Sequence, residues 1–394
     1  MNPPHELCFL YVNIGRGHPF YFDGIVEALG SSEQGAPEVL VLDVREGQPR
    51  LVRLLWDSMG WVYRHGGSPG LTGWLYAVLR RGANRGGPGF SRSILRRAYR
   101  GSSPELFGET VVVSHPLLVG ALPGQFRVIY QHGEMVAPDG ALVTGADEVL
   151  VPTEAVADLF VKAGYSRGQV FVSGLCIEPG AVKVAEAAYR KRLDRRVQSA
   201  PLAGLFVSSG AEPYQHVRRL ISSITSCQRA GVRAIVLAQE GGKLDREVRR
   251  MSCKTGLKVT NLTSPQLGDL VSADCIVVAC RSNSEESQAI AQLLPQLDFF
   301  VGPSHERTNW AVGLGLPMFA LTPCIGPFAP LNLKLLEDSG TTLAINSERD
   351  AACLGETLID LRRSGQLARM AESGWGKYRI DGFEQIARFL ANRI

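Results

Sequence analysis

The sequence predicts an α/β protein of two domains, each built on an open parallel β-sheet. The chain has 394 residues, which is more than a single ordinary hydrophobic core organises. Short apolar runs alternate with amphipathic segments, and continuous apolar runs are typical of strands buried on both faces of a parallel sheet. This alternation occurs in two series, with a glycine-containing break between them. The three observations together favour two α/β domains over one larger domain.

The two series predict the strands and the domain limits. Strands are expected at 8–14, 38–44, 110–115, 127–132, 148–153 and 169–174, and then at 202–210, 233–239, 257–262, 274–280, 298–302 and 316–322. A basic helix is expected over 183–196 and an amphipathic helix around 383–393. The expected parts are an N-terminal domain (1–178), a linker helix (179–200), a C-terminal domain (201–376) and a segment packing back on the N-terminal domain (377–394).

Composition argues against several classes of protein. Hydrophobic residues make up 45% and charged residues 20% of the chain, which is typical of folded proteins. The net charge of +4 favours no particular partner. None of the eight cysteines forms a CxxC pair, so we expect reduced thiols in a cytosolic protein and neither a zinc site nor a disulfide framework. No signal peptide or membrane-spanning run is evident, so any contact with a membrane is expected from its surface.

The first predicted strand leads into a glycine loop, NIGRGHPFYFDGIVEAL (13–29). Gly15 and Gly17 allow the backbone to turn tightly on either side of Arg16. Ligands of open parallel sheets bind beyond the carboxyl ends of the strands, so we expect His18 at the mouth of a ligand site. The alternative is a histidine that only caps the following helix. The loop lacks the GxGxxG pattern, so it supports dinucleotide binding only weakly.

Further histidines directly follow other predicted strands. They are His115, His132 and His305, which join His18 at strand carboxyl ends. One histidine in such a place is usually structural, but several indicate a site for acid–base chemistry or phosphate binding. Glu134, two residues after His132, is placed to orient that histidine or share its role.

Five segments, in order along most of the chain, resemble the inverting glycosyltransferases. They are GRGHPFYFDGIVEAL (15–29), VVVSHPLLVGALP (111–123), VIYQHGEMV (128–136), VPTEAVADLFVKAGYSRGQVFVSGLCIEPG (151–180) and LGLPMFALTPCIGPFAPLNLKLLEDSG (314–340). They are most similar to the monogalactosyldiacylglycerol synthases and processive diacylglycerol glucosyltransferases, and more distantly to the lipid II-forming N-acetylglucosaminyltransferase. The resemblance implies the GT-B fold, with two facing Rossmann-like domains and a cleft between them.

The same resemblance implies a reaction. A sugar would pass from a nucleotide-diphosphate donor, most simply a UDP-sugar, to a lipid or other hydrophobic acceptor, with inversion and without a metal or cofactor. His132 is the expected base for the acceptor hydroxyl, with His18 and Glu134 as rivals. Helix dipoles and cations would stabilise the leaving diphosphate. The expected acceptor-side residues are Gly15, Arg16, Gly17 and His115.

The resemblance places the donor mainly on the C-terminal domain. A pyrophosphate needs backbone N–H groups and helix N-termini, which the SSGAEP (208–213) and PSHERTN (303–309) segments are expected to supply. The nucleobase would lie near NLTSP (261–265). The expected donor-binding residues are Ser208, Ser209, Gly210, Leu262, Ser304, His305, Arg307, Thr308, Asn309 and Asn332.

The donor-side motifs also depart from the family. A family glutamate that binds the donor ribose is replaced by Trp310, with Glu306 one helical turn earlier. Phe328 and Ala329 stand where relatives carry polar residues for the sugar. The donor pocket is therefore altered. The alternatives are a different donor, a non-catalytic binding protein that has kept the fold, or a soluble transferase or nucleotide-sugar epimerase.

Residues 50–100 form a basic, aromatic segment with ten arginines and one acidic residue, Asp57. Tryptophan and tyrosine favour membrane interfaces, and arginine binds anionic headgroups, so we expect this segment on the cytoplasmic face of a membrane, beside the acceptor. An ordinary arginine-rich surface with core tryptophans is an alternative. Nucleic-acid binding is a third, for which no accompanying motif is present. The expected membrane residues are Trp56, Trp61, Trp74, Arg80, Arg81, Arg96 and Arg97.

Overall fold

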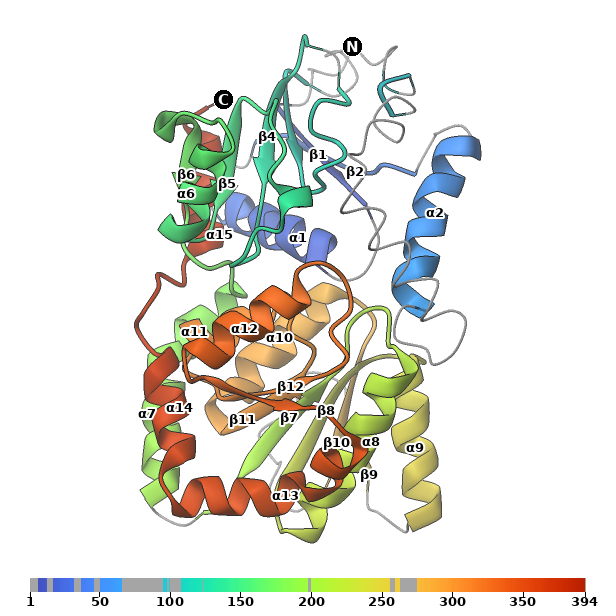
Figure 1. The fold of residues 1–394 in the computed structure, drawn as a ribbon, viewed down its shortest axis with the longest axis vertical. Helices are drawn as coiled ribbons and strands as arrows, with labels where there is room; N and C mark the ends of the chain where they lie inside the picture. The colour runs from blue at the N-terminus through green and yellow to red at the C-terminus, as the bar shows by residue number, and fades with distance from the viewer. Residues whose placement is uncertain are drawn as a thin grey trace. The chain divides into compact units, whose positions relative to one another are not determined.

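Two parallel β-sheets organise the chain, one in each of two units (Figure 1). The first unit comprises Met1–Cys176 with Asp381–Ile394, and the second comprises Ile177–Ile380. The computed structural model describes residues 6–12, 17–31, 37–45, 50–65, 95–97, 99, 108–122, 124–197, 200–255, 259–262 and 275–393. The predicted class, an α/β protein with two Rossmann-like sheets, is confirmed.

The sheet of the first unit has the strand order β2-β1-β3-β4-β5-β6, and every pair is parallel. Its strands are β1 (Leu7–Tyr11), β2 (Val39–Asp43), β3 (Thr110–Val113), β4 (Arg127–Gln131), β5 (Glu148–Val151) and β6 (Val170–Val172). The helices of this unit are α1 (Gly17–Gly30), α2 (Arg50–His65), α6 (Glu154–Lys162) and α15 (Gly382–Ala391), with short 3-10 turns at Asp139–Ala141 and Arg167–Gln169.

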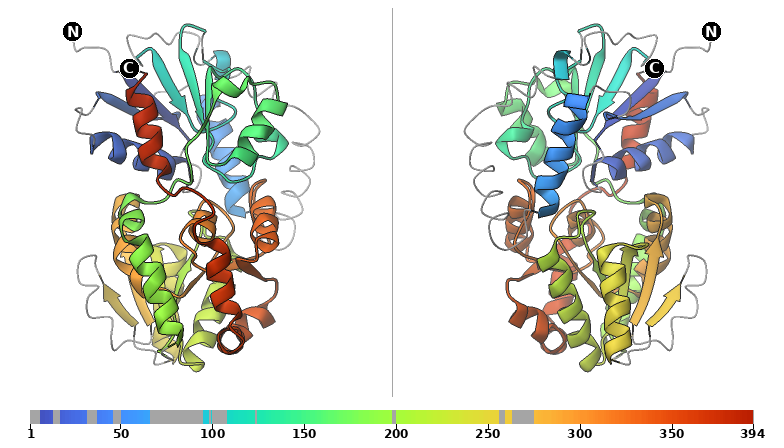
Figure 2. Two further views of the ribbon diagram at one scale, coloured as in Figure 1. Left: turned by 90° about the vertical axis from the view of Figure 1, so that its left-hand side faces the viewer. Right: turned by 90° about the vertical axis from the view of Figure 1, so that its right-hand side faces the viewer.

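Alternating side chains of this sheet enter two separate cores. Phe9 and Ile129 face the core that includes α1 and α15, whereas their neighbours Leu10 and Tyr130 face the opposite core. This alternation is the period of two expected for a strand with both faces covered. Helices α1 and α15 lie side by side (Figure 2). A Cβ atom on Gly24 of α1 would lie 2.4 Å from the Phe383 ring, so glycine is required for this close approach.

The sheet of the second unit has the order β13-β12-β11-β7-β8-β10-β9, again with parallel pairs only. Its strands are β7 (Ala203–Val207), β8 (Arg233–Gln239), β9 (Val259–Leu262), β10 (Cys275–Cys280), β11 (Phe299–Gly302), β12 (Met318–Leu321) and β13 (Thr342–Ile345). The helices are α7 (Pro179–Val197), α8 (Tyr214–Arg229), α9 (Lys243–Thr255), α10 (Asn283–Leu293), α11 (Thr308–Gly313), α12 (Ala329–Asp338), α13 (Glu348–Arg363) and α14 (Gln366–Gly374), with a 3-10 turn at Leu294–Gln296.

Each predicted strand is present, and several end earlier than predicted. The run predicted over 202–210 forms a strand only to Val207, because the serines and glycine that follow turn away as a loop. Strand β13 was not predicted. It lies at the edge of its sheet, and Leu343 is 41% exposed there. No helix in the described ranges is both long enough and apolar enough to cross a bilayer.

Candidate functional site

The order of the strands in the second sheet changes direction next to β7. From β7 the chain continues to β8, β9 and β10 on one side of the sheet, and then crosses to β11, β12 and β13 on the other. The loops that follow β7 and β11 therefore diverge at the carboxyl ends of two neighbouring strands. In open α/β sheets, ligands bind in the crevice at such a switch point. The loops concerned are 208–213 and 303–307.

Arg307 joins these two loops. Its Nη1 donates a hydrogen bond to the backbone oxygen of Ser208 over 2.8 Å, and its Nη2 donates to the carboxylate of Glu286 in α10. The carboxylate of Glu306 lies 3.9 Å from Nη1, and the guanidinium lies 5.6 Å from the centre of the Trp310 ring. Arg307 is only 6% exposed. The expected cation is thus present at the switch point, but two carboxylates already balance its charge.

Two hydroxyl groups beside Arg307 are buried without a partner. Within the part of the chain that the structure describes, Ser208 Oγ and Thr308 Oγ1 make no hydrogen bond, and the Nε–H of Arg307 makes none either. Buried polar groups in proteins are nearly always hydrogen-bonded. These donors are therefore suited to an oxygen-rich ligand at the carboxyl ends of β7 and β11.

Other residues that were expected to bind the nucleotide-sugar donor bond to one another or to the backbone of the site. Ser304 Oγ donates to the backbone oxygen of Ala329 over 2.8 Å, and Asn332 Nδ2 donates to the backbone oxygen of Ser304 over 3.1 Å. These bonds fix the loop after β11 against the start of α12. Asn309 is buried in α11, whereas Ser209 is half-buried and Gly210 is exposed in the loop after β7.

His305 is half-buried in the loop after β11. Burial lowers the pKa of its imidazole, the nearby carboxylate of Glu306 opposes this effect, and the Arg307 cation adds to it. His305 is therefore favoured in its neutral form, in which it donates one hydrogen bond and accepts another.

Trp310 lies where the resemblance led us to expect a ribose-binding glutamate. Its indole Nε1 donates a hydrogen bond to Glu178 Oε2 over 2.8 Å, and both side chains are buried. Glu178 lies just before α7, 132 residues away in the sequence. The side chain of Trp310 therefore has a structural partner inside the second unit and supplies no carboxylate. Of the neighbouring departures, Phe328 is half-buried before α12 and Ala329 is 1% exposed.

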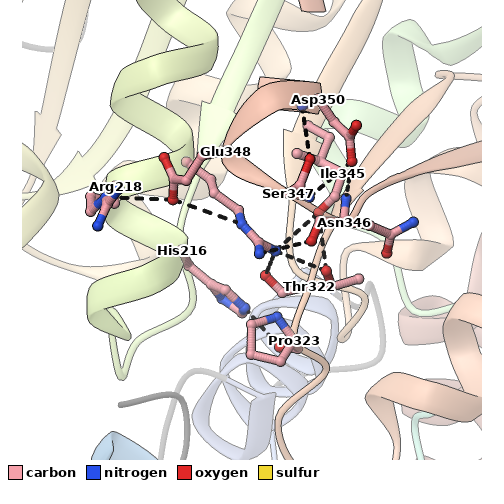
Figure 3. Close-up of polar contacts among 10 residues, drawn as sticks. His216, Arg218, Thr322, Pro323, Ile345, Asn346, Ser347, Glu348 and Asp350 are labelled. Carbon is pink, nitrogen blue, oxygen red and sulfur yellow. Dashed lines mark hydrogen bonds and ion pairs between the residues drawn. The ribbon is translucent and has the colours of Figure 1, made fainter. Parts of the chain in front are cut away.

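A polar cluster on α8 was not expected from the sequence. His216 Nε2 donates a hydrogen bond to the backbone oxygen of Pro323 over 2.9 Å (Figure 3). Arg219, one turn further along α8, donates to the backbone oxygen of Thr322, to Thr322 Oγ1 at 2.8 Å, and to the backbone oxygens of Ile345 and Asn346 at 3.1 and 2.9 Å. Helix α8 thus holds the loop after β12 and the end of β13. The available signal was HVRR (216–219), which begins three residues after the SSGAEP loop.

In the first unit, His132 is 3% exposed and follows β4. Its Nε2 donates to the backbone oxygen of Val136 over 3.1 Å, and its Nδ1 lies 3.5 Å from the hydroxyl of Tyr130. Burial lowers the pKa of His132 to about 4, against the opposing effect of backbone hydrogen bonds at Val136 and Glu134. The imidazole is therefore neutral near pH 7, and its role as a base stays a prediction. Glu134 is half-buried.

In the basic aromatic segment (50–100), one residue was wrongly expected to contact a membrane. Trp56 is fully buried in α2, where its ring meets His115 edge-on at 5.2 Å, so it packs in the core and does not face a membrane. His115 accepts a hydrogen bond at Nδ1 from the backbone N–H of Leu117 over 3.2 Å. Trp61 is 42% exposed, and Arg96 donates to the backbone oxygen of Gly120 over 2.7 Å.

Of the remaining expected residues, two are described, and the others lie wholly or partly outside the described ranges. Arg97 is exposed, and Gly17 begins α1. His18 and Leu262 have described backbones, in α1 and β9, without described side chains. Gly15, Arg16, Trp74, Arg80 and Arg81 lie outside the described residues. Among the residues that are described, no three side chains of His, Cys, Asp or Glu gather closely enough to bind a metal ion.

Comparison with solved structures shows the fold of the whole chain. The chain is similar to S. aureus MnaA bound to UDP, with 14% identity, a TM-score of 0.55, and 99% of this chain and 98% of MnaA covered. It is also similar to the UDP-GlcNAc 2-epimerase of Neisseria meningitidis bound to UDP-GlcNAc, with 10% identity, a TM-score of 0.54, and 98% and 99% covered. The protein therefore has the two-domain GT-B fold. No protein-family model and no curated protein sequence matches it.

Proposed function

We propose that this protein binds a UDP-sugar on its second unit and transfers the sugar to a lipid or other hydrophobic acceptor, with inversion and without a metal. One observation carries the proposal. The buried hydroxyls of Ser208 and Thr308 have no partner in the described part of the chain, and they flank Arg307 at the switch point of the sheet. The MnaA and Neisseria structures contain UDP and UDP-GlcNAc, respectively.

The diphosphate would be held mainly by neutral donors. Phosphate oxygens accept hydrogen bonds, and hydroxyl and backbone N–H groups supply them without adding charge. Arg307 is paired with Glu286 and Glu306, so its role is to hold Ser208 in place more than to neutralise the ligand. Ser209 and Gly210 continue the same loop. Fixed donors of this kind also stabilise a leaving diphosphate as its charge develops.

Acceptor activation is the part of the proposal that belongs to the first unit. His132 is neutral near pH 7 and so has a lone pair for a proton. Because Nε2 carries the hydrogen that it donates to Val136, this lone pair is on Nδ1, so the acceptor hydroxyl must reach Nδ1 in place of the hydroxyl of Tyr130. Glu134 and His18 stay the rival bases.

The lipid-acceptor part of the proposal rests on α2. Leu54 is 65% exposed and Trp61 is 42% exposed. They are seven residues apart, so they lie on the same side of the helix. Arg53 is exposed in the same helix. An exposed leucine and tryptophan beside arginine suit the interface of an anionic membrane.

Nucleotide binding tests the proposal directly. We would titrate the full chain with UDP, UDP-glucose, UDP-galactose and UDP-GlcNAc by calorimetry, with ADP and GDP for comparison. Ser208→Ala and Thr308→Val each remove one hydroxyl, and a hydrogen bond to a charged group contributes about 1.5–3 kcal/mol. We therefore expect each variant to bind the preferred uridine nucleotide about tenfold more weakly or worse.

Ser223→Ala is the matched control. Ser223 is also a buried serine of the second unit, and its hydroxyl has no partner among the described residues, but it lies in the middle of α8. Its removal should leave nucleotide affinity unchanged. Failure of every nucleotide to bind the unchanged protein would contradict the proposal. Conversion of a bound UDP-sugar to its epimer without an acceptor would instead assign the epimerase alternative.

A further inference from the structure

His216 lies where three loops of the second unit meet. It is the third residue of α8, which follows the loop after β7. Its ring is hydrogen-bonded to Pro323 in the loop after β12 and interacts electrostatically with His305 in the loop after β11. These three strands are neighbours in the sheet. Figure 3 shows the imidazole directed toward Pro323. The side chain is 1% exposed.

The hydrogen bond to Pro323 fixes the state of the ring. A backbone carbonyl can only accept, so the hydrogen atom of a neutral imidazole must be on Nε2. The pKa of His216 is lowered to about 4, chiefly by burial and further by His305 and the positive charge of Arg219, against the opposing effect of the bond to Pro323. The ring is therefore neutral near pH 7. Its Nδ1 carries a lone pair and acts only as an acceptor.

This acceptor has no partner within the described part of the chain, although it is buried. An unsatisfied buried acceptor costs about 1–3 kcal/mol. The ring is nevertheless held in place. Arg219 donates hydrogen bonds to the backbone and side chain of Thr322, next to the Pro323 carbonyl that accepts from His216. A fixed, buried and unused acceptor is suited to a ligand that brings a hydrogen-bond donor.

We propose that Nδ1 of His216 accepts a hydrogen bond from a hydroxyl group of the bound nucleotide sugar, which makes His216 a specificity-determining residue. This inference rests on the proposed function and refines it. The diphosphate of a nucleotide sugar is fully ionised near pH 7 and has no proton to donate, so we assign a hydroxyl of the ribose or of the sugar as the partner. The site would then discriminate against ligands that lack this hydroxyl, because the acceptor stays unpaired in their complexes.

Two substitutions distinguish the roles of Nδ1 and Nε2 of His216. His216→Gln keeps an amide N–H that can reach the backbone oxygen of Pro323, and it loses the acceptor at Nδ1. His216→Asn keeps a polar atom near the place of Nδ1 and loses the bond to Pro323. We would measure the affinity of each variant for UDP, UDP-glucose, UDP-galactose and UDP-GlcNAc by calorimetry, and the melting temperature of each without ligand.

We expect His216→Gln to weaken binding about tenfold with little change in melting temperature, and His216→Asn to keep more of the affinity. A loss with UDP itself assigns a ribose hydroxyl, whereas a loss only with the UDP-sugars assigns a sugar hydroxyl. If the unchanged protein binds a nucleotide and His216→Gln binds it equally well, the inference is overturned while the proposed function stands. If the unchanged protein binds no nucleotide, both fail.

A second measurement covers the case in which His216→Gln does not fold. In the unchanged protein, the nitrogen-15 resonance of Nδ1 moves when that atom accepts a hydrogen bond. A shift of the His216 resonance at saturating UDP-sugar supports the inference. An unchanged resonance at saturation overturns it.

Discussion

Single residues show how the altered positions of the expected donor site, above all Trp310, fit into the folded protein. Trp310 stands where a carboxylate was expected from the sequence, and its indole donates to the buried carboxylate of Glu178 from a distant part of the chain. The same ring lies beside the guanidinium of Arg307, which in turn holds Ser208. The replacement therefore belongs to a contiguous set of contacts that ends at the candidate ligand site. This is why a change at Trp310 is expected to affect the framework of the site.

Trp310→Phe should lower the free energy of unfolding by about 1.5–3 kcal/mol, because the carboxylate of Glu178 loses a buried donor. Urea denaturation checks the value. The matched control is Glu178→Gln, combined with Trp310→Phe in a double-mutant cycle. If the indole acts through the charged carboxylate, Trp310→Phe should cost clearly less in the Glu178→Gln background. Equal costs in both backgrounds would contradict this account.

At the scale of helices and strands, the sequence predicted most clearly the strands whose two faces are both buried. Strands β3 and β5 are buried at every residue, and their apolar runs are continuous. Strand β13 was not predicted; its apolar run is only Leu343, Ala344 and Ile345, and Leu343 is 41% exposed at the edge of the sheet. The same reasoning placed the 208–213 and 303–309 loops at one edge of a sheet, since parallel strands end together.

The side-chain partners in the site could not be predicted in the same way. Glu178 and Trp310 are 132 residues apart, and His216 and Pro323 are 107 residues apart. Such contacts depend on which helical turn faces which loop, and periodicity does not specify that. Trp56 was misassigned for a related reason. A tryptophan in an arginine-rich helix suits a membrane interface or a core equally well, and only the packing against His115 decides.

Helix α2 gives the prediction at this scale. Replacing both Leu54 and Trp61 with alanine should reduce binding to anionic phospholipid vesicles at least tenfold, because each exposed side chain would lose the gain from leaving water. Co-sedimentation with vesicles measures the effect. The control is Leu331→Ala in α12, which removes a 40% exposed leucine from the other unit and should leave binding unchanged. Equal vesicle binding by the Leu54/Trp61 variant and the unchanged protein would remove α2 from the acceptor model.

At the scale of the whole molecule, each unit contains, among its described residues, a buried histidine that is held in its neutral form. His132 belongs to the first unit and His216 to the second, and both donate from Nε2 to a backbone oxygen. Burial lowers the pKa of each to about 4 from a usual value of 6.5. The unfolded chain therefore binds protons at these residues at a higher pH than the folded chain. Stability must then fall as pH decreases from the unfolded pKa toward the folded one.

Between pH 7 and pH 5, each of these histidines should lower the free energy of unfolding by about 2 kcal/mol, since one pKa unit corresponds to about 1.4 kcal/mol. Urea denaturation across this range, with separate probes for the two units, measures the slope. His132→Gln and His216→Gln remove the titrating group and should each flatten the pH dependence of their own unit, whatever they do to its stability at pH 7. A slope that is unchanged in either variant would mean that the histidine concerned is not held neutral in the folded protein.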